Sequence, residues 1–166
     1  MIVGDAAHLD PVADFKPSIV VARNAFHHMD QHQQVVSEMR RIATKNTAFV
    51  IIECTAPSQA KKEWQQLFEK KDVGRTLYQT HDEFRGYFEN LMGQRVRHQD
   101  VYISRGNDVQ SWVTNSGRAM GVFKEISHFC ESMPHSVRNH LGIWLRDGRL
   151  AIDKQFSYLE FGGAEP

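Results

Sequence analysis

The sequence predicts an α/β fold with a mostly parallel sheet, and three patterns along the chain carry that prediction. Residues 18–22 and 48–52 are short continuous apolar runs, typical of strands buried on both faces of a parallel sheet. Residues 30–43 lie between them and repeat apolar side chains at helical spacing, which makes a βαβ unit. After the Asp147-Gly148 turn, residues 150–161 place apolar side chains mostly on one face, which indicates an antiparallel closing strand.

The helix between the two runs has a defined beginning and a defined buried face. Asp30 is a good N-cap residue, because its carboxylate can accept from the unpaired N–H groups of the first turn. The apolar side chains of this segment share one face: Val35, Val36, Met39, Ile42 and Ala43. We therefore expect this face to pack against the sheet.

The remaining segments are mainly helical and precede the closing strand. Thr80 and Glu83 have capping-box spacing and begin one helix, while Asp108 caps a short helix around Trp112. Pro134 stands at a first-turn position, where proline is favoured. The other expected elements are a strand at 94–104 and helices at 58–71, 120–131 and 134–145.

Composition and charge describe a globular domain without a bias toward one class of partner. Apolar residues make up 41% of the 166 positions and twenty basic side chains balance twenty acidic ones, so we expect no nucleic-acid partner. The longest positive cluster, Lys61-Lys62 with Lys70-Lys71, falls on a helix expected to be solvated. No apolar run could cross a bilayer, and residues 1–5 lack the charged start of a secretory signal. We therefore expect a cytoplasmic protein with no membrane span, in which Cys54 and Cys130 are reduced.

Three segments in chain order resemble class I S-adenosylmethionine-dependent methyltransferases. The first is Val3-Gly4-Asp5-Ala6, followed by Leu9, and the second is the run Ile-Val-Val-Ala-Arg-Asn-Ala-Phe-His-His at 19–28. The third is the helix with Glu38-Met39-Arg40-Arg41-Ile42, which leads into residues 49–53. The resemblance is closest to the small-molecule methyltransferases that include C-methylating enzymes of quinone biosynthesis, and it spans nearly the whole chain.

This resemblance implies a Rossmann-like methyltransferase sheet and S-adenosyl-L-methionine as the cofactor. In the family, an Asp followed by a small residue at the end of the third strand meets the adenine, which assigns Asp5 and Ala6 to cofactor binding. The loop after the fourth strand passes the methionine end of the cofactor, which assigns Arg23, Asn24 and Ala25.

The sequence also departs from the family pattern. Lys45-Asn46-Thr47 stands where most of these enzymes carry a Gly-Gly turn, although Asn tolerates a left-handed conformation. The glycine-rich turn after the first strand and the acid that binds the ribose are not found, so residues 1–166 are expected to form one N-terminally incomplete methyltransferase domain. In the family the first strand pairs with the fourth, so residues 18–22 would present an open apolar edge. We expect a truncated chain, or a homo-oligomer or complementing chain at that edge, and weak or no cofactor binding by the chain alone.

Further candidate residues follow from their chemistry and position. His27 and His28 are candidates for a catalytic base or for substrate contact, with a surface role as the alternative. Tyr78 and Trp112 are candidates for lining a substrate pocket, with core packing as the alternative. A helical insertion at about 108–145, before the last strand, is expected to cover the substrate.

No metal site is expected in this sequence. The histidines closest together along the chain lack ligand spacing, and no cysteine or carboxylate partner accompanies them. These histidines are His8, His27, His28 and His32.

The predicted function is methyl transfer to a small-molecule acceptor. This in-line displacement depends mainly on alignment and desolvation, so we expect turnover to depend on Asp5 and on the loop of Arg23, Asn24 and Ala25 rather than on the histidines. The alternative is a non-catalytic binding or partner subunit of the same fold, and cofactor binding by the isolated protein separates the two. A hydrolase is disfavoured, because the sequence has no Gly-x-Ser-x-Gly elbow and no phosphate loop.

Overall fold

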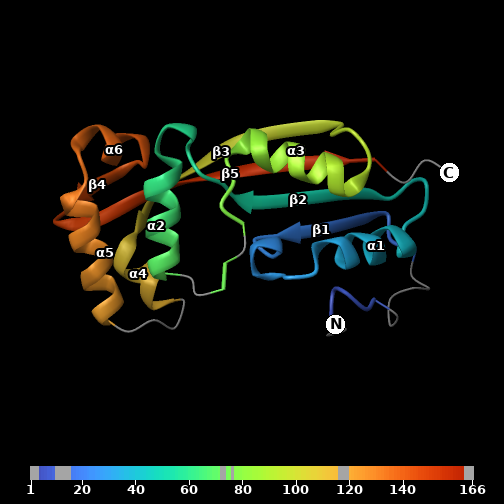
Figure 1. Cartoon of the computed structure of the whole chain (residues 1–166), viewed down its shortest axis with the longest axis horizontal. Coiled ribbons are helices and arrows are strands. Elements are labelled where there is room, and N and C mark those ends of the chain that lie inside the picture. The colour runs from blue at the N-terminus through green and yellow to red at the C-terminus, as the bar shows by residue number, and fades with distance from the viewer. Residues whose placement is uncertain (1–3, 10–15, 72–73, 76, 116–119, 163–166) are drawn as a thin grey trace.

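The computed structural model describes residues 4–9, 16–71, 74–75, 77–115 and 120–162 (Figure 1). Within these ranges the chain forms one five-stranded sheet in the order β1-β2-β5-β3, with β4 paired to β5 beyond the end of β2. The strands are β1 (Ile19–Arg23), β2 (Ala48–Cys54), β3 (His98–Asp108), β4 (Ile143–Arg146) and β5 (Arg149–Phe161).

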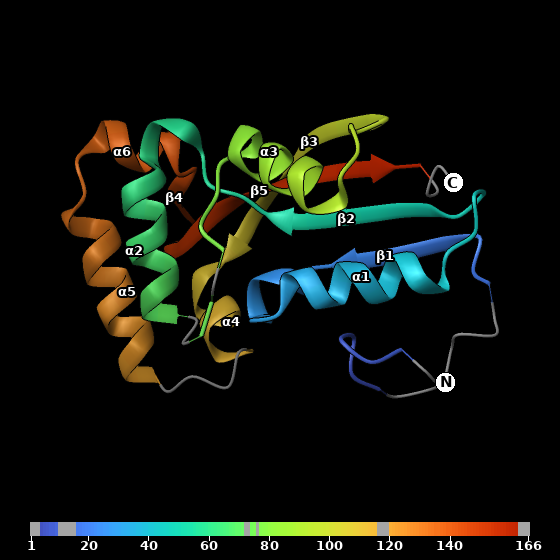
Figure 2. The same ribbon diagram turned by 45° about the vertical axis from the view of Figure 1, so that its right-hand side comes forward.

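Six α-helices accompany the sheet in the described residues. They are α1 (His32–Ile42), α2 (Lys61–Lys71), α3 (His81–Met92), α4 (Val109–Thr114), α5 (Met120–Ser132) and α6 (His135–His140). Two views show that α2, α4, α5 and α6 gather around the end of the sheet where β4 lies, while α1 and α3 accompany the other end (Figures 1 and 2). In the described part of the chain, no helix is long and apolar enough to cross a membrane.

The strand directions confirm the predicted mostly parallel sheet with an antiparallel closing strand. β1 pairs with β2 in parallel, from Ile19 opposite Ala48 to Arg23 opposite Ile52, and α1 connects them as the expected βαβ unit. β5 runs antiparallel to both β2 and β3, so β1, β2 and β3 all point the same way. Their carboxyl ends therefore lie toward one end of the sheet, where open α/β sheets bind ligands.

Two apolar clusters form the core. The first joins α1 and α3 to one face of the sheet and includes Phe26, Val36, Met39, Phe49, Ile51, Phe84, Phe88, Leu159 and Phe161. The second lies under α2, α4 and α5 and includes Trp64, Leu67, Phe68, Val109, Val113, Ile126, Cys130, Ile143 and Ile152. The face of α1 that the sequence predicts to be buried is confirmed, since Val35, Val36, Met39 and Ile42 are all buried.

The first strand differs from expectation, because it is not buried on both faces. Val20 and Ala22 pack against the first cluster, whereas Ile19 and Val21 are 53% and 55% exposed on the opposite face. Among the described residues, β1 pairs only with β2, so it is an edge strand. The apolar run predicts the strand correctly, but the layer that would bury its second face is not among the described residues.

The segment 134–145 is the largest error of the sequence prediction. Only α6 is helical there, and Gly142 follows in the left-handed region at φ 61°. Residues Ile143–Arg146 then form β4, which pairs with β5 across the Asp147-Gly148 turn. Both turn residues have positive φ, as a two-residue hairpin requires, and the β-branched and aromatic residues before the turn favour the strand.

Two smaller boundaries also differ. The strand expected at 94–104 forms at 98–108, because Gly93 ends α3 in a left-handed conformation and pairing with β5 begins only at Arg97. Asp30 does not cap α1, whose N-cap residue is Gln31 with no side-chain hydrogen bond. The capping box of Thr80 and Glu83 is confirmed.

Candidate active site at the carboxyl ends of β1 and β2

The chain leaves β1 through a strand-end loop, residues 23–28, that turns sharply away from the sheet. Asn24 adopts a left-handed conformation at φ 49°, which Asn tolerates better than most residues. Its N–H donates to the carbonyl of Ile52 at 2.8 Å, so the turn stays attached to β2. Phe26 is fully buried and anchors the 3-10 turn Phe26–His28 that follows.

Glu53, at the carboxyl end of β2, organises this loop. Its carboxylate accepts hydrogen bonds from the N–H groups of Ala25 and Phe26, each at 2.8 Å, and from Nδ1 of His27 at 2.5 Å. Glu53 is 2% exposed, and three donors compensate the cost of burying its charge. Because a carboxylate only accepts, Nδ1 of His27 carries a proton and Nε2 becomes the basic atom of the neutral ring.

A second contact supports the loop from α1 and α3. Nε2 of His32 donates to the carbonyl of Phe26 at 2.7 Å, and its Nδ1 lies 2.6 Å from the hydroxyl of Tyr87. Burial raises the pKa of Tyr87, so its hydroxyl stays protonated and donates a hydrogen bond to Nδ1 of His32. The turn that carries His27 is therefore fixed on two sides, by Glu53 and by His32.

A cavity of about 190 Å³ adjoins this loop, and we call it the loop pocket. Its walls come from the strand-end loop, the end of β2, the C-terminal half of α2, α4 and β5. The lining residues are Asn24, His27, His28, Cys54, Phe68, Lys71, Arg75, Trp112, Lys154 and Phe156. The structure thus brings together four of the residues singled out in the sequence: Asn24, His27, His28 and Trp112.

The far wall of the loop pocket combines cations with aromatic rings. Nζ of Lys71 and Nζ of Lys154 lie 5.1 and 4.6 Å from the centroid of the Trp112 ring. Arg75 is 93% buried, since its relative exposure is 7%, and its guanidinium lies 4.7 Å from the Phe68 ring centroid. Cation–π contacts of this kind stabilise both partners when they are shielded from water.

Cys54 lies in this wall but is not a reactive thiol. Burial raises the pKa of the Cys54 thiol to about 11, although Arg75 and Lys154 act in the opposite direction. It therefore stays protonated near neutral pH and serves as a small apolar group. Cys54 and Cys130 are both free and buried, which confirms that they are not paired with each other.

The cations of this wall are the site residues that sequence reasoning missed. Lys71 was placed on a solvated helix face, but it is buried, and Arg75 and Lys154 were not singled out. One signal was available: Lys71 follows Leu67 and Phe68 by four and three residues, which puts it on the inward stripe of α2. No comparable pattern marks Lys154, because it stands in the polar run Asp153-Lys154-Gln155, where β5 does not alternate.

The remaining predicted site residues lie elsewhere. Arg23 is exposed at the end of β1 and does not line the loop pocket, while Ala25 holds the loop through its hydrogen bond to Glu53. Tyr78 packs against Trp64 at 6.2 Å between ring centroids, which places it behind the pocket wall.

Asp5 lies in a turn beside α1. Its Oδ1 accepts from the N–H of Ala7 at 2.9 Å, and this hydrogen bond is the main reason why the pKa of Asp5 is lowered. The carbonyl of Ala7 accepts from Gln34, and Leu9 donates to Glu38, so the segment is tied to α1. The Asp5 side chain is 68% exposed, which leaves an oriented, ionised acceptor at the surface.

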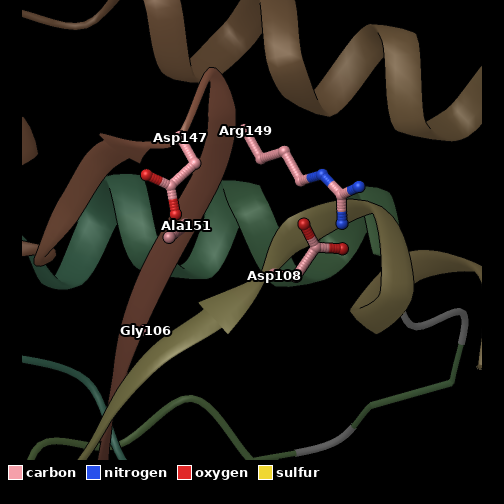
Figure 3. Close-up of a pocket in the computed structure, with 5 residues that line it drawn as sticks. All are labelled: Gly106, Asp108, Asp147, Arg149 and Ala151. Atoms are coloured by element: carbon pink, nitrogen blue, oxygen red, sulfur yellow. The ribbon is translucent and has the colours of Figure 1, made fainter.

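A second, larger cavity lies at the hairpin of β4 and β5, away from the strand-end loop. It measures about 470 Å³ and is lined by Gly106, Asp108, Asp147, Arg149 and Ala151. Figure 3 shows the side chains of Arg149 and Asp108 facing one another across it. Asp108 caps α4 by accepting from the N–H of Ser111 at 2.6 Å, which lowers its pKa. Its carboxylate therefore has a structural role, and none of the cofactor, substrate or catalytic candidates from the sequence lines this cavity.

Two groups of residues that the family resemblance assigns to S-adenosylmethionine have side chains whose chemistry is compatible with it. The exposed, oriented carboxylate of Asp5 suits an adenine amino group, and the strand-end loop presents Asn24 beside a pocket at a parallel strand end. In the described residues, no three His, Cys, Asp or Glu side chains gather in a way that could hold a metal ion.

Comparison with known proteins gives a family match and a fold match. A family model described as a methyltransferase domain matches residues 1–51, which include Asp5, β1, the strand-end loop, α1 and the start of β2. No curated protein matches the chain.

Two solved structures resemble the chain over most of its length. A protein of Bacillus halodurans C-125, provisionally assigned as a methyltransferase, superposes with a TM-score of 0.79 at 19% identity, covering 95% of this chain and 68% of its own. The YcgJ protein of Bacillus subtilis superposes with a TM-score of 0.75 at 17% identity, covering 98% of this chain and 70% of its own. At these identities the likeness establishes the fold.

Proposed function

We propose that this chain, a class I S-adenosylmethionine-dependent methyltransferase by its family match and its fold, transfers a methyl group to a small-molecule acceptor in the loop pocket. One observation carries the proposal. Glu53 holds the strand-end loop so that Asn24 and His27 line a cavity at the carboxyl ends of two parallel strands.

Two groups of residues in the N-terminal part of the chain would hold the cofactor. Asp5 and Ala6 would meet its adenine, and Arg23, Asn24 and Ala25 would pass its methionine end, as the family resemblance implies. When bound, S-adenosylmethionine supplies an electrophilic methyl carbon. The loop is held by its hydrogen bonds to Glu53 and Ile52, so it would present a fixed surface to the methionine end.

His27 is suited to take the proton from the acceptor. Nδ1 already donates to Glu53, so the proton arrives at Nε2, and the carboxylate stabilises the positive ring that results. The electron pair left on the acceptor atom would form the new bond to the methyl carbon while the bond from that carbon to sulfur breaks, and S-adenosylhomocysteine would be the leaving group. His28 lies against His27 with ring centroids 4.0 Å apart, and the aromatic side chains around Trp112 form an apolar wall of the pocket.

The open edge of β1 supports a further part of the proposal. Its backbone pairs only with β2 among the described strands, and Ile19 and Val21 expose apolar surface beside it. We propose that a strand of a complementing chain, or of a second copy of this chain, covers this edge. The alternative is a non-catalytic partner subunit, and it rests only on the lack of a glycine-rich turn within residues 1–166.

A methyl-transfer assay tests the proposal. The chain would be joined at its N-terminus to the glycine-rich strand, turn and helix of a class I methyltransferase, which we call the joined protein. We expect the joined protein to move label from methyl-tritiated S-adenosylmethionine to small nucleophilic acceptors, and His27→Ala to reduce the rate at least about tenfold. Cofactor binding without transfer to any acceptor would favour the non-catalytic alternative instead.

A further inference from the structure

β3 forms the edge of the sheet opposite β1, and it is the longer of these two strands (Figure 1). Among the described strands β3 pairs only with β5, in a regular register over residues 98–104, before an irregularity between Ser104 and Asn107. An edge strand presents backbone N–H and C=O groups with which another strand can pair. We call residues 98–105 the β3 edge.

The middle of the β3 edge exposes three consecutive apolar side chains. Val101, Tyr102 and Ile103 are 39%, 39% and 45% exposed, and all three are residue types enriched in strands. Successive side chains of a strand point to opposite faces, so Val101 and Ile103 share one face and Tyr102 lies on the other. Apolar surface on both faces of a long edge strand favours the addition of a further strand.

A hydrogen bond within the strand shows which backbone groups face outward. The N–H of Val101 donates to Oδ1 of Asp100 at 2.7 Å, so this N–H points away from β5. In an antiparallel ladder the backbone groups of alternate residues point the same way, so Val101 and Ile103 face outward and Tyr102 faces β5. An added strand would therefore pair with the backbone of Val101 and Ile103.

The β3 edge is complementary to a second copy of itself. With a twofold axis at Tyr102, two antiparallel copies place Val101 of each opposite Ile103 of the other. These outward-facing residues form hydrogen-bonded pairs, and their aliphatic side chains meet on one face of the joined sheet. The same axis brings the two Tyr102 side chains together on the other face and places Gln99 opposite Arg105, so like charges are not opposed.

Neighbouring registers match less well. An axis at Val101 would place Gln99 opposite Ile103, which sets a polar side chain against an apolar one. An axis at Ile103 would place Val101 opposite Arg105, with the same mismatch. Because cross-strand pairs of apolar side chains stabilise a sheet, the sequence of β3 favours the axis at Tyr102.

Tyr102 is already held in place for this contact. Its ring is stacked on Phe156, with 5.1 Å between centroids and 10° between planes, so little side-chain freedom remains to be lost on association. Phe156 lines the loop pocket, so the contact would adjoin a residue of the pocket wall.

We propose that two copies of this chain associate through the β3 edge, with Val101 and Ile103 paired across a twofold axis at Tyr102. The two sheets then continue as one. Pairing over residues 99–105 alone gives a contact at or below the lower end of the roughly 1,200–2,000 Å² of stable interfaces, so the dimer is weak, with a Kd in the micromolar range. This proposal does not depend on methyl transfer, and it concerns the edge opposite β1.

Sedimentation equilibrium of the chain tests the association. We expect the average mass to rise toward that of a dimer between about 5 and 200 µM. Ile103→Lys places an ammonium group opposite Val101 in both halves of the contact and should weaken the dimer at least about tenfold. Val21→Lys is the matched control, because Val21 is an exposed aliphatic residue on the other edge strand, and it should leave the dimer unchanged.

A disulfide tests the register. The two copies of residue 102 would form a pair without backbone hydrogen bonds, with Cα atoms about 4.5 Å apart, so Tyr102→Cys should cross-link two chains under mild oxidation. Asp100→Cys is the control on the same face, because its two copies would lie more than about 13 Å apart and should not cross-link. Cys54 and Cys130 are buried, so they do not compete for the new thiol.

Three results would overturn the inference. They are a monomer at every concentration, loss of the dimer in Val21→Lys with none in Ile103→Lys, and equally fast cross-linking of Asp100→Cys and Tyr102→Cys. The first would leave the β3 edge to a strand of another protein, and the second would assign the contact to β1. If circular dichroism shows that Ile103→Lys is misfolded, the two cysteine variants still decide between the outcomes.

Discussion

The open side of β1 exposes aliphatic side chains, whereas the wall of the loop pocket buries charged ones. On β1, Ile19 and Val21 are more than half exposed although they are aliphatic. In the pocket wall, Lys71 and Arg75 are more than nine-tenths buried although they are charged. The strand-end loop begins at the end of β1 and lines the loop pocket, so it links the two regions.

The difference shows which region is complete within the described residues. In the pocket wall, aromatic faces and carbonyl acceptors compensate the buried charges, so this region is stabilised by contacts within the described residues. The side of β1 has exposed apolar surface and an edge with no strand partner among the described residues, so it resembles half of an interface. Glu53 connects the two regions, because it fixes the loop that passes from one to the other.

Glu53→Ala should have the largest effect of any single substitution considered. It leaves the N–H groups of Ala25 and Phe26 and the ring of His27 without their buried acceptor. We expect a loss of about 3 kcal/mol in the free energy of unfolding, measured by urea denaturation, or a fall in Tm of roughly 6–12 °C. Glu69→Ala, at an exposed position on α2, is the control and should stay within about 0.5 kcal/mol. An equal loss in both variants would show that the loop does not depend on Glu53.

Ile51→Ala and Ile19→Ala compare the buried and the open strand directly. Ile51 is fully buried in β2, so its truncation should cost about 3 kcal/mol. Ile19 is half exposed in the described structure, so the same change should cost less than about 1 kcal/mol in the chain alone. Similar costs would mean that the face of β1 is covered in solution, and sedimentation equilibrium would then show whether a second copy covers it.

Cofactor affinity tests the expectation that residues 1–166 alone hold the cofactor poorly. We expect the chain alone to bind S-adenosylhomocysteine weakly or not at all, because its sequence has no glycine-rich turn. The joined protein should bind at least about a hundredfold more tightly, which corresponds to about 2.7 kcal/mol. Calorimetric titration measures both. Submicromolar binding by the chain alone as a monomer would show that other residues hold the cofactor.

The sequence predicted the open region better than the pocket wall. The two apolar runs and the helix between them fix the βαβ unit, since strand and helix periodicities are local properties. The open edge at 18–22 followed from the family resemblance, and β1 is indeed an edge strand in the described part of the chain. Burial of β1 on both faces was wrong, because burial depends on layers that a strand's own residues do not encode.

The pocket wall depends on contacts between distant segments, which periodicity does not reveal. Lys71 and Lys154 meet at Trp112 only because α2, α4 and β5 converge. The segment before β5 shows the same limit, since Ile143 is in a strand and pairs with Ile152, although a helix was expected. His27 was identified from its place after a strand, but its connection to Glu53 became visible only in the structure.

Asp5→Ala and Asn24→Ala test the two ends of the expected cofactor site in the joined protein. Asp5→Ala should raise the apparent KM for S-adenosylmethionine about five- to tenfold, because one hydrogen-bond acceptor is lost. Asn24→Ala should lower kcat more than cofactor affinity, because Asn24 shapes the turn beside the pocket. Asn46→Ala, in the exposed turn before β2, is the control. Unchanged kinetics in both Asp5→Ala and Asn24→Ala would show that these residues do not hold the cofactor, and only the role of His27 would then remain.

The smallest predicted effect concerns the attachment of residues 4–9 beside the open region. Glu38 accepts from Arg41 and from the N–H of Leu9 at 2.8 Å, and these contacts, with Arg41 as the larger cause, lower the pKa of Glu38 to about 2 from a usual value near 4.5. A lowered folded-state pKa means that the carboxylate holds the segment fully above about pH 4.5 and loses its effect as the pH falls toward 2. NMR of the Leu9 amide should therefore show a titration well below pH 4.5, with faster hydrogen exchange at its end. Glu38→Gln keeps an acceptor without a charge and should remove the titration. A midpoint near 4.5 in the unmodified chain would show that Glu38 does not hold this segment, and Asp5 would then lose its fixed position beside α1.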